Sequence, residues 1–96
     1  MTTWRELREN RLANGEASAA YDRARRSFEI GARVRELRLA AGLTQAQLGA
    51  RVGTSQSALA RLEAGGVEPR LSTLEALGHA LGAQLIVNFE PDQLAS

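Results

Sequence analysis

The 96-residue sequence contains no cysteine, no lysine and only two prolines. Without cysteine, the chain can build neither a disulfide framework nor a thiolate metal site. Long apolar runs are also missing, since none approaches the ~20 residues that a membrane-spanning helix needs, and the opening MTTWRELREN is polar. We therefore expect a cytoplasmic protein without a membrane-spanning segment.

Positive charge is unevenly distributed, although the formal net charge is only +1. All twelve basic residues are arginine, and nine of them lie at or before Arg38, whereas the chain after Arg70 contains acidic residues and no arginine. Attraction to phosphate is local, because salt screens it over ~10 Å. This asymmetry suggests one side that faces a polyanion; a genomic preference for arginine would give the same composition.

Residues suited to catalysis or cofactor binding are scarce. The single histidine, His79, has neither a cysteine nor an adjacent carboxylate with which to form a catalytic dyad. The pair Gly65-Gly66 lacks the spacing of a phosphate-binding loop. We predict that the chain is not an enzyme and has no cofactor and no metal site.

Helix signals begin early in the chain. Trp4, Leu7 and either Arg11 or Leu12 follow helical spacing, with Thr3 as a candidate N-cap. After a break at Asn14-Gly15, the composition favours a helix from about 17 to 41, although Gly31 weakens it. One face of this helix carries apolar residues at helical spacing: Ile30, Val34, Leu37 and Ala41.

Three shorter helices are expected next, over 45–52, from about 56 to 64, and over about 73–81. Thr44 and Gln47 form a capping box before the first, Ser55 is the N-cap of the second, and Ser72 with Glu75 forms a capping box before the third. Glycines suited to close the four main helices are Gly42, Gly53, Gly65 and Gly82. The expected inward-facing residues of the short helices are Leu48, Val52, Leu59, Leu62, Leu74, Leu77 and Leu81.

The last predicted element has the two-residue period of a strand instead of the spacing of a helix. Leu85, Val87 and Phe89 alternate with their neighbours over residues 84–89, which predicts a strand that ends at Pro91. A single strand on a small helical domain leaves backbone groups unpaired. We therefore predict a two-fold homodimer in which two such strands pair antiparallel through these three side chains; the alternative is a strand that folds back on its own domain.

The segment LTQAQLGARVGTSQSALARLEAG meets the requirements of two helices that cross at a steep angle, with Gly49 at the close approach and Gly53 in the turn. It resembles the Cro and phage-repressor helix-turn-helix family, also called XRE-type, over roughly residues 30–81. The resemblance implies an all-α, lambda-repressor-like bundle of four to five helices. We expect a helical extension over 1–29, a DNA-binding domain over 30–82, and a dimerising strand with its tail over 83–96.

The resemblance also implies site residues for binding double-stranded DNA. The helix from about Gln56 would enter the major groove, and the positions that contact bases or nearby phosphates are Ser55, Gln56, Ser57 and Arg61. Gln45 matches a phosphate clamp, and Arg70 lies in a loop that similar proteins lay along the DNA backbone. Ser55 could instead act only as a helix cap, and Arg61 could be a solvated surface charge. Arg38 and Glu63 match a structural salt bridge.

The ending ALGAQLIVNFEP and the long amino-terminal extension also resemble HigA-type antitoxins, which neutralise a small basic RNase toxin and repress their own operon. That resemblance implies a toxin contact within residues 1 to about 30, including Trp4, Leu7 and Arg11. Three functions stay open: an antitoxin and autorepressor, a stand-alone XRE-type transcriptional regulator, and a protein-interaction module that no longer binds DNA. Both DNA-binding functions imply an inverted-repeat operator.

Overall fold

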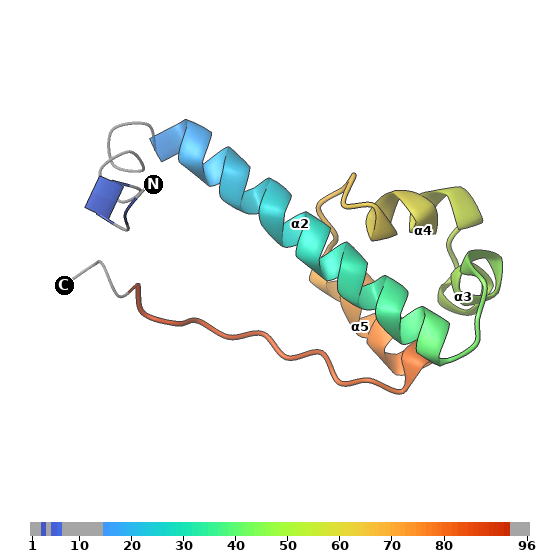
Figure 1. Ribbon diagram of the computed structural model, residues 1–96. Coiled ribbons are helices and arrows are strands. Elements are labelled where there is room, and N and C mark those ends of the chain that lie inside the picture. Colours follow the sequence, from blue (N-terminus) through green and yellow to red (C-terminus); the bar gives the residue numbers. More distant parts are fainter. Residues whose placement is uncertain (1–2, 4, 7–14, 93–96) are drawn as a thin grey trace.

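The computed structural model describes residue 3, residues 5–6 and residues 15–92, and the description below concerns these residues. They contain four labelled helices (Figure 1): α2 (Gly15–Ala40), α3 (Gln45–Val52), α4 (Gln56–Glu63) and α5 (Leu71–Leu81). This agrees with the expected all-α helix-turn-helix bundle. None of these helices is long and apolar enough to cross a membrane. Trp4, Leu7 and Arg11 lie outside the described residues.

Helix α2 is much longer than the other three, and its first half extends beyond them (Figure 1). Its second half contains Gly31, which sequence analysis treats only as a weakness. A side chain there would place its Cβ 2.6 Å from the carbonyl oxygen of Glu63, and closer still to that of Leu62. Gly31 is therefore required by the close packing of α2 against the end of α4.

Short-range hydrogen bonds set the boundaries of α3 and α4. The Gln47 amide donates to Thr44 Oγ1 at 3.0 Å, and the Thr44 amide donates to Gln47 Oε1 at 2.9 Å, which is the predicted capping box. Gly53 has a φ of 74°, so the turn between the helices uses a backbone conformation that other residues rarely adopt. Ser55 Oγ accepts a hydrogen bond from the Ala58 amide at 3.0 Å and caps α4.

The start of α5 differs from the prediction. The helix begins at Leu71, with Arg70 as an N-cap that makes no side-chain capping bond, so the expected capping box of Ser72 and Glu75 is wrong. The amide of Leu74 already bonds to the Arg70 carbonyl at 3.0 Å. Because the helix starts directly after the extended backbone of Arg70, Ser72 lies within the first turn and cannot act as the cap.

The core lies where α2, α3, α4 and α5 meet. Its buried apolar residues are Val34, Leu48, Leu59, Leu62 and Leu77. All five were expected to face inward, and Leu48 has no exposed surface at all. Ala41, by contrast, is exposed and lies beyond the end of α2, so its assignment to the apolar face is wrong.

Residues 83–92 follow α5 as an extended segment with no helix or strand assigned (Figure 1). The strand expected at 84–89 is therefore not formed within this chain. A backbone hydrogen bond from the Ala83 amide to the Gly78 carbonyl, at 2.8 Å, closes the end of α5. A strand is defined by a hydrogen-bonded neighbour, and the described residues of one chain provide none. Val87 and Phe89 stay exposed.

Candidate nucleic-acid interface

The candidate interface is built on the first residues of two helices. Gln45 begins α3 and Gln56 begins α4, and the Gln56 side-chain Nε2 donates a hydrogen bond to Gln45 Oε1 at 2.7 Å. The Gln45 Nε2 in turn donates to Glu63 Oε1 at 3.1 Å. Two residues that are 11 positions apart in the sequence therefore lie side by side, and Gln56 has a fixed neighbour on the scaffold.

Glu63 forms a buried ion pair with Arg38. The Arg38 Nε donates to Glu63 Oε2 at 2.6 Å and the Nη2 donates to Glu63 Oε1 at 2.9 Å, so the guanidinium binds both carboxylate oxygens in a bidentate pair. The third nitrogen, Nη1, donates to the carbonyl of Leu43 at 2.8 Å. The side chains are 9% and 3% exposed, respectively. This pair joins α2 to α4 as the resemblance implies, and it ends the chain of contacts that begins at Gln56.

Burial alone would raise the pKa of the Glu63 carboxyl group. Hydrogen bonds from Arg38 and Gln45, together with the positive charges of Arg38 and Arg35, outweigh that effect and hold the pKa below its ordinary value. The hydrogen bond to Glu63 likewise raises the pKa of Arg38, against an opposing contribution from burial. Both groups are therefore charged at neutral pH. The negative charge of Glu63 is therefore compensated within the protein by that of Arg38.

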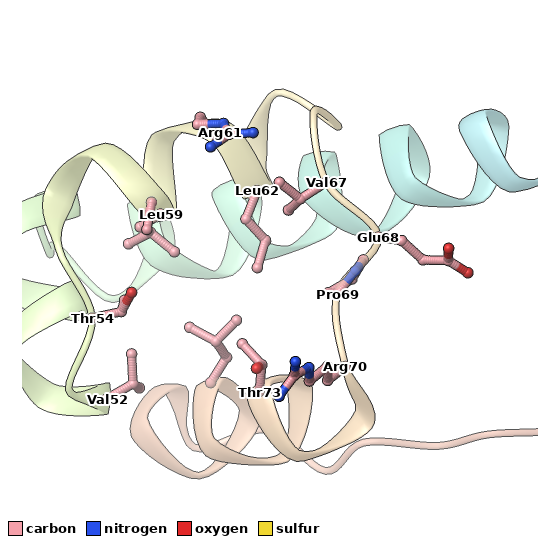
Figure 2. Close-up of a pocket in the computed structure, with 12 residues that line it drawn as sticks. Val52, Thr54, Leu59, Arg61, Leu62, Val67, Glu68, Pro69, Arg70 and Thr73 are labelled. Carbon is pink, nitrogen blue, oxygen red and sulfur yellow. The ribbon is translucent and has the colours of Figure 1, made fainter.

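Arg61 and Arg70 border a second feature of this surface, an open cavity of about 310 Å³ between α4, α5 and the loop that joins them (Figure 2). Leu59 and Val67 contribute apolar side chains to its wall. Glu68 also lines it, and its carboxylate points away from both arginines (Figure 2). Arg61 lies in the last turn of α4, while Arg70 directly precedes α5.

The six residues predicted to bind DNA therefore form two pairs and two single positions. Gln45 and Gln56 are hydrogen-bonded to each other, and Arg61 and Arg70 line one cavity. Ser57 is exposed on the first turn of α4, four positions before Arg61 and thus on the same helix face. The hydroxyl of Ser55 is engaged in capping α4, although the residue is exposed.

The link between Gln45 and Glu63 was missed by sequence analysis, which treated the phosphate clamp and the salt bridge as separate devices. The only signal for it in the sequence was that Gln45 and Gln56 each stand at the first position of a predicted helix. Within residues 3, 5–6 and 15–92, no three His, Asp or Glu side chains gather closely enough to hold a metal ion.

Comparison with known proteins agrees with this geometry. A family model described as a helix-turn-helix domain matches residues 29–86, a range that includes every residue of the candidate interface. The immunity repressor protein of Bacillus phage phi105 is 43% identical over 56 residues, which cover 58% of this chain and 39% of the repressor. The match thus spans about two fifths of that relative. No solved structure gives a significant match. These matches do not test the resemblance to HigA-type antitoxins.

Proposed function

This chain belongs to the helix-turn-helix domain family, and from that premise we propose that it is a sequence-specific DNA-binding protein that represses transcription. The family supports DNA binding. The similarity to a phage immunity repressor supports repression as the outcome. The observation that carries the proposal is the contact between Gln45 and Gln56, because it holds a polar side chain ready at the start of α4.

In the proposed complex, α4 lies in the major groove. Its eight residues span about 12 Å, which is close to the width of that groove. Gln56 can donate to and accept from adenine at the same time, and Arg61 can bind the two acceptors of guanine. Ser57 adds a hydroxyl on the same helix face as Arg61.

Phosphate contacts would position α4 in the groove. Gln45 lies at the amino end of α3, where free backbone N–H groups and the helix dipole favour an anion. Arg70 offers a charged contact on the other side of the cavity in Figure 2. Such contacts add affinity without reading sequence, so their loss weakens binding to every DNA site alike.

Selection of binding sites from random duplex DNA tests this proposal. We expect an enriched motif for the native chain, and a changed preference at one base pair for the Gln56→Ala variant. Arg61→Ala should also change the preference at one base pair. Arg25→Ala is its control, because it removes the same charge from an exposed position of α2, where Arg25 lies 3.7 Å from Glu29. If the native chain enriches no motif, the function as a protein-interaction module without DNA binding replaces the proposal.

A second candidate function, the antitoxin of a type II toxin-antitoxin pair, is favoured by the first half of α2. That half extends away from the bundle (Figure 1). Residues 15–28, which precede the matched family range, include the exposed residues Tyr21 and Phe28. A surface of this kind could bind a protein partner such as a small basic RNase toxin. Co-expression with the neighbouring genes, followed by affinity purification, tests it. Recovery of a small basic protein supports the antitoxin; purification of the bare chain with full operator binding supports a stand-alone regulator.

A further inference from the structure

The cavity between α4, α5 and their connecting loop has an apolar floor (Figure 2). Leu59 and Leu77 are each 2% exposed and Leu62 is 6% exposed, so the floor is formed by side chains of the hydrophobic core. Val52 and Val67 add apolar groups to the walls. The volume of about 310 Å³ lies at the lower end of the range for small-molecule sites, which is roughly 300–1,000 Å³. Such sites are likewise mostly apolar, with a few polar groups that fix the ligand.

The polar side chains that line this cavity have unused binding capacity. Thr54 and Thr73 are two of them, and within the part of the chain that the structure describes neither hydroxyl group makes a hydrogen bond. Arg61 and Arg70 likewise form no ion pair with any described residue. The carboxylate of Glu68 points away from both arginines (Figure 2). The cavity thus combines an apolar floor with two positive charges that no side chain neutralises.

We propose that this cavity binds a small organic acid that consists of one carboxylate and a short apolar chain. The carboxylate meets Arg70 and Thr73, which lie three positions apart at the start of α5 and line the cavity on that side (Figure 2). A guanidinium binds both oxygens of a carboxylate, and the hydroxyl adds a further donor. The apolar chain lies across Leu59 and Leu77. A compact anion such as phosphate satisfies only the polar side and leaves the apolar floor in contact with water.

Occupancy of the cavity also affects DNA binding, and this one consequence rests on the proposed function. Arg61 and Arg70, which line the cavity, are also two of the residues proposed to contact DNA. An acid in the cavity takes the charge of Arg70 away from a DNA phosphate and lies beside α4. Acid and operator therefore oppose each other, and each raises the dissociation constant of the other by the same factor. The acid is thus an inducer that releases the repressor from its operator.

Binding of the acid needs no DNA, so it is tested first on the full chain alone. Nuclear magnetic resonance of the isotope-labelled chain is followed during titration with hexanoate at constant ionic strength. We expect saturable shifts at the residues of the cavity. Across acetate, butanoate and hexanoate the dissociation constant should fall about two- to fourfold for each added methylene group, because each one covers part of the apolar floor. Hexanol, which lacks the carboxylate, should bind at least about tenfold more weakly than hexanoate.

Two variants with matched controls show whether hexanoate binds in this cavity. Thr73→Leu removes the hydroxyl group and fills part of the cavity; its control is Ser72→Leu, because Ser72 is exposed and does not line the cavity. Arg70→Ala removes the cation from an exposed position; its control is Arg25→Ala on α2. Thr73→Leu and Arg70→Ala should each raise the dissociation constant of hexanoate at least about tenfold, and the controls should leave it unchanged. Circular dichroism should show the same helix content in all four variants.

Operator binding then tests the role as an inducer, with the DNA motif that site selection yields. Hexanoate should weaken operator binding by the native chain, and acetate at the same concentration should have much less effect. Thr73→Leu should bind the operator with native affinity, because Thr73 is not among the proposed DNA contacts, and hexanoate should no longer change that affinity.

Three results would overturn the inference. If hexanoate binds no more tightly than acetate, the cavity is only an anion site of the kind that a DNA phosphate uses. If Thr73→Leu and Arg70→Ala both bind hexanoate as the native chain does, the acid binds elsewhere. If bound hexanoate leaves operator affinity unchanged, the acid is no inducer. Failure of the proposed function looks different, because the native chain would then bind hexanoate in the cavity but select no DNA motif.

Discussion

Replacement of Glu63 by glutamine should destabilise the fold strongly. The carboxylate is 3% exposed and accepts two hydrogen bonds from the buried Arg38 guanidinium, at 2.6 and 2.9 Å. Glutamine has nearly the same shape, so packing is conserved while the negative charge is lost. Arg38 then remains buried with the Leu43 carbonyl as its main acceptor. Leaving one partner of a buried pair uncompensated costs about 3–5 kcal/mol.

A loss of this size is a large part of the total stability of a small domain, which is roughly 5–15 kcal/mol. Urea denaturation followed by circular dichroism measures it as a drop in the free energy of unfolding. In thermal denaturation the melting temperature should fall by roughly 12–40 °C, since 1 kcal/mol corresponds to about 4–8 °C for a domain of this size. Glu36→Gln is the matched control. Glu36 pairs with Arg33 on the exposed surface of α2, so its loss should cost less than about 1 kcal/mol.

The double variant Arg38→Met with Glu63→Leu tests the reasoning from the other direction. Two apolar residues leave no buried charge, and such replacements are often neutral or stabilising. We expect most of the lost stability to return. Operator affinity should stay low, however, because Gln45 no longer has the Glu63 carboxylate as an acceptor and Gln56 loses its fixed neighbour. The reasoning is refuted if Glu63→Gln costs no more than Glu36→Gln, or if the double variant is as unstable as the single one.

Acidification should reproduce part of the same loss. The pKa of Glu63 is lower in the folded state than in the unfolded state. The stability that ionised Glu63 contributes is therefore present at pH values above the unfolded pKa and is lost as the pH falls through the folded pKa. Urea denaturation at a series of pH values should show the stabilities of the native chain and the Glu63→Gln variant converging in acid. Arg61→Ala should weaken operator binding by about 1–3 kcal/mol and relax the preference at one base pair, as measured in competition assays. An equal loss of affinity for all DNA sequences would mean that Arg61 contacts phosphate instead of a base. Gly31→Ala should destabilise the fold by about 1–3 kcal/mol or more, because the added Cβ meets the backbone of α4; Gly15→Ala, where nothing lies within 4 Å, is the control and should be neutral or slightly stabilising in the same denaturation assay.

Local chemistry allowed much of the bundle to be predicted from the sequence. The capping box of Thr44 and Gln47 and the N-cap Ser55 act over three residues, so their pattern in the sequence is enough to place the starts of α3 and α4. The glycines expected at helix ends all have positive φ angles: Gly42, Gly53, Gly65 and Gly82. The prediction at Ser72 failed because two capping positions compete there, and the backbone before α5 favours Arg70.

Tertiary structure decided the features that depend on residues far apart in the chain. A glycine at position 31 looks unfavourable in a helix until α4 packs against it. The contacts from Gln56 through Gln45 to Glu63 join α3 to α4, and no pattern within either helix encodes them. Residues 84–89 have the alternation of a strand, but a strand forms only when a neighbour supplies the other half of each hydrogen bond. Helix boundaries follow from short-range hydrogen bonds between residues close in the sequence. The candidate interface and the conformation of residues 84–89 depend instead on which distant surfaces meet.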